Sequence, residues 1–254
     1  MINRDNLYKT LLYLLIAINC WSLPLHAALA DDALLLEQRK KYVVAKKALS
    51  AGKLSLFKKT SAGLKDYPLY PYLRYNYLKR RLWKVKSTEI SGFLAHYNDL
   101  PMANDLRKSW LSLLAKRKHW QSYVDNYTPQ QSKTLQCYQL QARIKTKSDA
   151  YLLEDIRTVW LAGESLPPQC DPAFALLYKS NLMTDELVWQ RIRLSMINNQ
   201  PALASFLSRR LSKEEQIWAK RWIAMHQNPS SGTHKPKYDD VPIAREILLH
   251  GMHR

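Results

Sequence analysis

Cysteine is the residue type in this sequence whose possible chemistry is easiest to delimit. The chain contains Cys20 near its N-terminus, Cys137 and Cys170 in its interior, and 7 histidines. A catalytic thiol needs a neighbouring base, and a structural metal site needs about four suitable ligands. The sequence indicates neither arrangement. We therefore expect no metal site and no cofactor, and a structural role for the interior cysteines.

The acidic residues offer no arrangement that is typical of a glycosidase. No pair of carboxylates that would flank a glycosidic bond can be assigned from the sequence. Glu164 is followed by Ser165, but the pair comes after Gly163 in a segment that predicts a loop. A general acid needs a water-poor pocket that raises its pKa, and a surface loop offers none. We therefore predict that the chain has no catalytic residue.

The first 30 residues have the pattern of a secretory signal peptide. Two basic residues precede a largely apolar run over 11–25, and residues 28–30 supply small side chains where signal peptidase cleaves. The apolar run is interrupted by Asn19 and Pro24 and is shorter than the roughly 20 residues of a membrane-spanning helix. We expect cleavage after Ala30, export of the mature chain, and no integral membrane segment in it.

Export changes the interpretation of the cysteines. Cys20 could be the lipidated residue of a lipoprotein, but Asn19 does not fit the position before such a cysteine. With cleavage after Ala30, Cys20 is removed together with the signal peptide. Cys137 and Cys170 then remain as a pair in an oxidising compartment, and we predict that they form a disulfide. Such a bond contributes roughly 3 to 4 kcal/mol in the chain-entropy model.

The pattern of the mature chain predicts an all-α fold. Apolar residues make up 46% of the sequence and recur at helical spacing, while the chain has only 6 glycines. Gly52 is placed to end the first helix, and Ser87, Thr184 and Ser212 are placed as N-caps. Helices of about ten to fifteen residues joined by short loops favour a right-handed superhelix, an α-solenoid of stacked helical hairpins.

This organisation divides the chain into three parts. Residues 1–30 are the expected signal peptide, and residues 31–227 are the expected superhelical domain. Residues 228–254 predict a linker, which ends near Asp240, and a short terminal helix. A solenoid that is truncated at such a point leaves an uncovered apolar face.

The segment KDYPLYPYLRYNYL, residues 65–78, contains five tyrosines and two prolines. The prolines suit the bend and first turn of a helix, and the tyrosines continue at helical spacing. Exposed aromatic rings can also stack on sugars, but tyrosine at helical spacing more often packs in the interior. We interpret the segment as packing between hairpins and keep glycan stacking as the alternative.

Three stretches carry a resemblance to a known family: LKDYPLYPYLRY (64–75), VWLAGESLPPQCDPAF (159–174) and VWQRIRLSM (188–196). They resemble the N-terminal superhelical region of the soluble lytic murein transglycosylases, bacterial periplasmic enzymes that cleave peptidoglycan glycan strands. The likeness runs from about Gln38 to Ile223. It implies a ring-forming stack of helices with one disulfide, placed here at Cys137 and Cys170.

The resemblance does not extend to catalysis. In that family a lysozyme-like domain follows the superhelix and supplies a catalytic glutamate in a Glu-Ser motif, which this sequence lacks outside the loop pair at Glu164. We therefore expect a periplasmic domain that acts in peptidoglycan binding or turnover. The alternatives are the N-terminal part of a lytic transglycosylase whose active domain is missing, and a protein-interaction solenoid.

The positive charge points to an anionic partner. Removing two basic and one acidic residue with the signal peptide leaves 37 Lys+Arg against 20 Asp+Glu, or +17. Export and the lack of a recognition motif argue against nucleic acid. Peptidoglycan is rich in carboxylates, so we expect it, or a cell-wall protein, as the partner. Candidate polyanion contacts are Arg80, Arg81, Lys116, Arg117, Arg209 and Arg210, although cations are also favoured at helix C-termini without any ligand.

Overall fold

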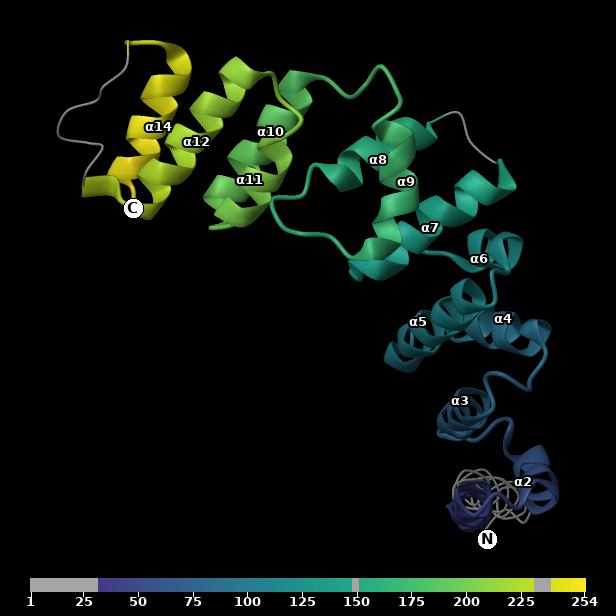
Figure 1. The fold of residues 1–254 in the computed structure, drawn as a ribbon. Coiled ribbons are helices and arrows are strands. Elements are labelled where there is room, and N and C mark those ends of the chain that lie inside the picture. Colours follow the sequence, from purple (N-terminus) through teal and green to yellow (C-terminus); the bar gives the residue numbers. More distant parts are fainter. Residues whose placement is uncertain (1–31, 148–150, 231–238) are drawn as a thin grey trace, which may run out of the picture. The chain divides into compact units, whose positions relative to one another are not determined.

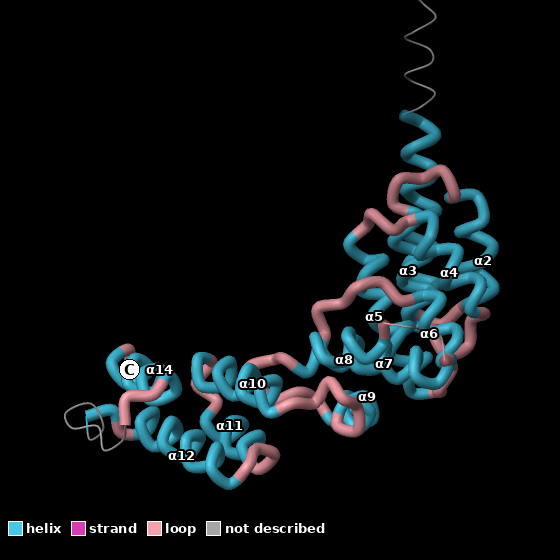
Figure 2. The backbone as a smooth tube through the Cα atoms, turned by 90° about the horizontal axis from the view of Figure 1, so that it is seen from above, coloured by secondary structure: helices cyan, strands magenta, loops and turns pink. Residues whose placement is uncertain are grey.

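The computed structural model describes residues 32–147, 151–230 and 239–254, which form helices, turns and loops (Figure 1, Figure 2). No strand occurs in these three ranges, so the predicted all-α fold is confirmed. The expected signal peptide, residues 1–30, lies outside the described residues, as does most of the predicted linker. Within the described ranges, no helix is both long and apolar enough to cross a membrane.

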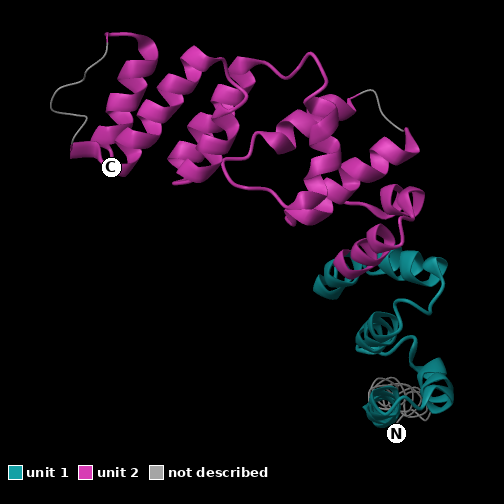
Figure 3. Ribbon diagram, viewed as in Figure 1, with its two compact units in different colours: residues 1–107 teal, residues 108–254 magenta. Residues whose placement is uncertain are grey.

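The chain forms two compact units, residues 1–107 and residues 108–254 (Figure 3). The described part of the first unit begins with a helix over 32–50. Gly52 follows it with a φ of 71°, a left-handed conformation that glycine adopts at little cost, so this predicted helix end is confirmed. The next elements are α2 (Leu54–Ser61), η1 (Ala62–Leu64), α3 (Tyr70–Arg80), α4 (Ser87–His96) and the first part of α5 (Pro101–Lys116).

The tyrosine-rich segment contributes only some of its rings to the core of the first unit. Tyr77 stacks on Phe57 with ring centroids 5.3 Å apart, and Tyr67 packs against a tyrosine of the helix over 32–50 with ring centroids 5.6 Å apart. Both are buried, whereas Tyr72 is 46% exposed. Packing between helices is therefore confirmed for Tyr67 and Tyr77 and wrong for Tyr72. Tyr72 directly precedes the buried Leu73 and thus points about 100° away from it around the helix.

The second unit contains the rest of α5 and a succession of short helices. They are α6 (Trp120–Asn126), α7 (Lys133–Thr146), α8 (Leu152–Trp160), η2 (Pro168–Cys170), α9 (Asp171–Leu177), α10 (Asp185–Ile197), α11 (Pro201–Ser208), α12 (Lys213–Gln227) and α14 (Pro242–Met252). Helix α6 packs on α7, α7 on α8, α8 on α9, α10 on α11, α11 on α12, and α12 on α14. Each helix thus packs mainly on its neighbours in the chain, which is the predicted stacking of helical hairpins.

The capping signals in the second unit act largely as predicted. The hydroxyl oxygens of Thr184 and Ser212 accept backbone N–H bonds at the starts of α10 and α12, at 3.2 and 3.3 Å. Glu215 does not complete a capping box, because its carboxylate accepts a hydrogen bond from the Trp189 indole at 3.1 Å and so ties α12 to α10. The predicted cap at Ser87 is wrong, since Ser87 is the first residue inside α4 and no side-chain cap bond is present.

A disulfide between Cys137 of α7 and Cys170 of η2 lies in the core of the second unit. The two Cα atoms are 4.7 Å apart, and both residues are fully buried. The buried cluster around them includes Trp160 of α8 and Phe174 of α9. The bond fixes the segment between α8 and α9, which forms one wall of a cavity that Ser165 and Leu166 help to line.

Candidate functional site

The cation clusters predicted from the sequence lie at helix ends. Arg80 and Arg81 end α3 in the first unit, Lys116 and Arg117 end α5, and Arg209 and Arg210 follow α11. This is the position that the helix dipole favours without any ligand. Arg80 and Arg81 line a cavity of about 350 Å³ beside Gly52. Arg210 lines a larger cavity, of about 490 Å³, together with the buried Arg191.

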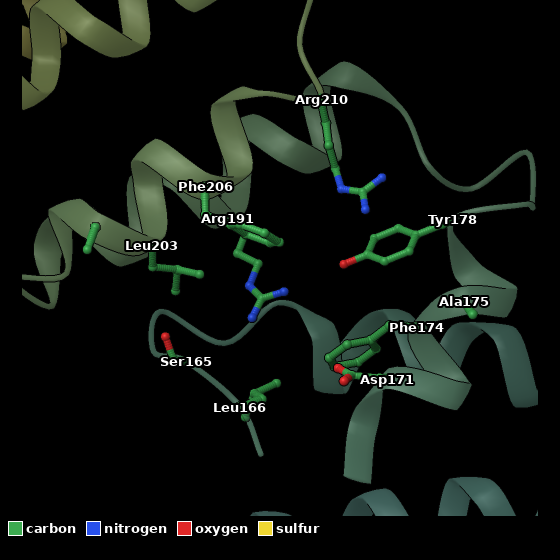
Figure 4. Close-up of a pocket in the computed structure, with 11 residues that line it drawn as sticks. Ser165, Leu166, Asp171, Phe174, Ala175, Tyr178, Arg191, Leu203, Phe206 and Arg210 are labelled. Carbon is green, nitrogen blue, oxygen red and sulfur yellow. The ribbon is translucent and has the colours of Figure 1, made fainter. Parts of the chain in front are cut away.

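The cavity lies between α9, α10, α11 and the loop over 161–167, and has a volume of about 490 Å³ (Figure 4). It lies entirely within the second unit. Its polar lining residues are Ser165, Asp171, Tyr178, Arg191 and Arg210. Its apolar lining residues are Leu166, Phe174, Ala175, Ala202, Leu203 and Phe206.

Arg191 is the most buried charge of the site, with 4% of its surface exposed. Its guanidinium lies over the Trp160 ring, 4.7 Å from the centroid, and 5.8 Å from the centroid of Phe174. The Nε atom donates to the carbonyl of Ala162 at 3.1 Å, and Nη2 donates to the carbonyl of Glu164 at 3.4 Å. Arg191 therefore anchors the loop through backbone oxygens, and no carboxylate pairs with it among the described residues.

Burial lowers the pKa of Arg191 to about 10, and this effect exceeds that of the neighbouring Tyr178, which raises the pKa. The side chain thus remains a cation at neutral pH. Carbonyl oxygens satisfy two of its five N–H donors but bring no negative charge. A desolvated cation of this kind is costly without a counter-charge.

Arg210 forms the outer wall of the cavity. Its guanidinium carbon lies 3.6 Å from the centroid of the Tyr178 ring, a cation–π contact that orients an otherwise exposed side chain. The Tyr178 hydroxyl accepts a hydrogen bond from the Trp160 indole at 3.2 Å. The ring that supports Arg210 is therefore itself held by the core. Asp171 is the one carboxylate of the lining.

The loop pair Glu164-Ser165 takes the position expected from the sequence. Glu164 lies between α8 and η2 with an exposed side chain, and its carbonyl is the group that Arg191 holds. Gly163 beside it is buried against the end of α10. A Cβ atom there would lie 2.6 Å from the carbonyl oxygen of Leu194. The loop can approach α10 this closely because residue 163 has no side chain.

Sequence reasoning identified Arg210 but missed Arg191 and Tyr178 as site residues. A signal for Arg191 exists, since it falls at the spacing of the buried residues Leu187, Val188 and Ile192 on α10. An arginine on the apolar face of a helix must find a special environment, which here is the loop and the cavity. Tyr178 lies just past the end of a short helix, and no pattern in the sequence singles it out.

The comparisons with known proteins agree with this architecture, an array of stacked helical hairpins. No protein-family model matches the chain. The soluble lytic murein transglycosylase of Escherichia coli K12 is 28% identical over 197 residues, which cover 77% of this chain and 30% of that protein. The corresponding protein of Salmonella typhimurium LT2 is 29% identical over 208 residues, or 81% of this chain and 32% of that protein.

Solved structures give the same result. The lytic transglycosylase Slt of Pseudomonas aeruginosa, solved as an inactive mutant, is 30% identical with a TM-score of 0.69, covering 84% of this chain and 35% of that chain. The 70-kDa soluble lytic transglycosylase in complex with bulgecin A is 25% identical with a TM-score of 0.70, covering 85% and 35%. The chain is a homologue of the soluble lytic murein transglycosylases over their superhelical domain, and it spans about a third of the length of these relatives.

Proposed function

We propose that this chain is a periplasmic peptidoglycan-binding domain that acts in cell-wall turnover without catalysis of its own. The observation that carries the proposal is the likeness to proteins named for murein, over 77% and 81% of the chain. The net charge of +18 supports it, because peptidoglycan carries many carboxylates that a basic surface concentrates. The cavity beside Arg191 and Arg210 supports it further, since it offers two cations against one carboxylate.

The absence of catalysis is part of this proposal. Cleavage of a glycosidic bond needs a proton donor in a groove that excludes water. Glu164 is exposed on the loop between α8 and η2, which is not a groove of that kind. Incubation of purified protein with sacculi should therefore release no anhydro-muropeptides. Release that disappears in the Glu164→Gln variant would overturn this part of the proposal.

Binding is tested by sedimentation with purified, insoluble sacculi across a salt series. We expect the protein to pellet with sacculi at low salt and to return to the supernatant as salt screens the attraction. A soluble protein of similar positive charge and unrelated fold serves as the control for non-specific attraction. Equal pelleting of the two proteins, or no pelleting of this chain at low salt, would count against the proposal.

A second candidate is that the chain acts as the N-terminal part of a larger lytic transglycosylase. One observation favours it: Ile197, Leu249 and Met252 are 72%, 52% and 65% exposed on α10 and α14, a surface suited to a further hairpin. Reading the genomic sequence downstream in all frames for a lysozyme-like domain separates the two candidates. A protein-interaction solenoid is the third candidate, and it would gain support if the chain ignored sacculi and captured a periplasmic protein.

A further inference from the structure

We propose that the cavity between α9, α10 and α11 is a carboxylate-binding site, with Arg191 as its inner cation and Arg210 as its outer one. This inference rests on the proposed function and deepens it, because it names the chemical group of peptidoglycan that the site recognises. The ligand class is a carboxylate joined to a compact body of sugar or peptide, which the apolar part of the lining would accommodate.

Arg191, the inner cation, is buried without a counter-charge in the described part of the chain. Arg191 is 4% exposed and has no carboxylate partner among the described residues, yet it lines an open cavity. Its two printed donor bonds run to the carbonyls of Ala162 and Glu164, which leaves three N–H groups without a protein acceptor in that part of the chain. A ligand carboxylate would supply both an acceptor and the missing counter-charge.

Arg210, the outer cation, is positioned by the ring of Tyr178. Arg210 lies over the Tyr178 ring and forms no ion pair among the described residues, so its guanidinium edge is available to a ligand. Figure 4 shows Arg191 entering the space from α10 and Arg210 reaching toward Tyr178 from the segment after α11. A single carboxylate has about four acceptor positions, enough for donors from two directions.

The rest of the lining restricts what the carboxylate is attached to. Asp171 faces the same cavity and opposes a ligand with a second negative charge close to the first. Phe174, Leu203 and Phe206 provide apolar surface for a sugar face or an alanyl side chain. With about 490 Å³, the cavity has room for one sugar residue or a dipeptide rather than a longer chain.

Three small probes test the inference by titration calorimetry with the full chain. N-acetylmuramic acid carries a carboxylate on a sugar, the dipeptide L-alanyl-D-isoglutamine carries it on a peptide, and N-acetylglucosamine carries none. We expect binding of at least one of the first two probes and no detectable binding of the third. The stronger of the first two identifies the source of the carboxylate. Equal binding of all three probes, or binding of none, would overturn the inference.

Matched variants locate the binding. Arg210→Gln should weaken binding of the preferred probe by about tenfold or more, because a charge-assisted hydrogen bond is lost. Arg209→Gln removes the same charge from the adjacent exposed residue outside the cavity lining, and it should leave affinity within about twofold. Equal effects of the two variants would show that general charge, not the cavity, binds the probe, which would overturn the inference.

Arg191→Lys completes the set, since it keeps the positive charge but cannot reproduce the guanidinium geometry. We expect weaker probe binding than in the unmodified chain, with unfolding measured in parallel to exclude loss of fold. Sedimentation with sacculi tests the proposed function separately from the cavity site. A chain that pellets with sacculi but binds no carboxylate probe would reject the cavity site and leave the proposed function standing.

Discussion

The guanidinium of Arg191 lies over the indole ring of Trp160, 4.7 Å from its centroid, and holds two backbone carbonyls of the loop that follows α8. Replacement by methionine keeps an apolar side chain on Trp160 but leaves those carbonyls without donors. We expect Arg191→Met to lower the free energy of unfolding by about 1 to 3 kcal/mol, because unsatisfied buried acceptors cost that much. Removal of a desolvated charge offsets part of this loss.

Urea unfolding measures the change, with Arg209→Met as the control on an exposed arginine. The control should stay within about 0.5 kcal/mol of the unmodified chain, as is usual for surface substitutions. An Arg191→Met variant that is more stable than the unmodified chain would show that the buried charge costs more than its hydrogen bonds contribute. That result would reject Arg191 as an anchor of the loop.

Gly163 and Gly92 form a matched pair for a test of loop packing. A Cβ atom at Gly163 would lie 2.4 Å from the Asn198 side chain and 2.6 Å from the Leu194 carbonyl, whereas one at Gly92, within α4, would meet nothing within 4 Å. We expect Gly163→Ala to destabilise the second unit by about 1 to 3 kcal/mol, the usual cost of overpacking. Gly92→Ala should stabilise the first unit by roughly 0.5 to 1 kcal/mol.

Circular dichroism during thermal unfolding reports both variants. Gly163 lies in the second unit and Gly92 in the first. If the two units unfold in separate steps, each variant should shift the melting temperature of its own unit. A Gly163→Ala variant with an unchanged melting temperature would mean that the loop does not rest against α10 as the structure shows.

Tyr77 and Tyr72 separate the two interpretations of the tyrosine-rich segment. Tyr77 is 7% exposed and stacks on Phe57, so Tyr77→Ala should cost about 3 to 5 kcal/mol, as for other large core truncations. Tyr72 is 46% exposed, and Tyr72→Ala should change stability by less than about 1 kcal/mol. If Tyr72→Ala keeps its stability but loses binding to sacculi, glycan stacking at this one position replaces packing as its role.

The pair His226 and His250 predicts a pH dependence of stability in the second unit. His226 Nε2 is 2.9 Å from the Asn199 side-chain oxygen, so it donates there, and its Nδ1 accepts from His250 Nε2 at 2.8 Å. Desolvation lowers the pKa of both histidines, and the positive charge of Arg254 lowers them further. Mutual repulsion and the nearby His253 add to the shift at His250.

A lowered pKa in the folded state means that the unfolded chain binds protons more readily below about pH 6.5, the ordinary value for histidine. The contribution to stability is therefore fully present above pH 6.5 and is lost as the pH falls through the lowered folded values. Melting temperatures between pH 8 and pH 5 measure the effect. His226→Gln should reduce the slope and His119→Gln, at an exposed histidine, should not; equal slopes in all three proteins would contradict the assignment.

Much of the fold follows from the sequence, because the signals that set it are local. Helical spacing, the glycine at residue 52 and the caps at Thr184 and Ser212 act within one turn of chain. Burial is less local: the same spacing argument covers Tyr72 and Tyr77, yet only the second faces a neighbouring helix. Ser87 fails as a cap because the helix begins one residue earlier than its pattern indicates.

Local sequence patterns of this kind do not predict the candidate site. Arg210 was predicted because it belongs to a run of cations, but that run alone does not distinguish it from Arg209. The distinction depends on Tyr178, on the loop at Gly163 and on Arg191, three parts of the chain that only tertiary packing brings to one cavity. A buried arginine without a carboxylate becomes recognisable only when its surroundings are known.

The most direct test of the central claim compares native sacculi with sacculi whose carboxylates have been converted to neutral amides. Purified protein is sedimented with equal masses of the two polymers at low salt, and the bound fraction is measured. If the chain binds to the carboxylates of peptidoglycan, the protein should pellet with native sacculi and remain largely in the supernatant with the amidated ones. Equal binding to both polymers, or binding to neither, would contradict the account.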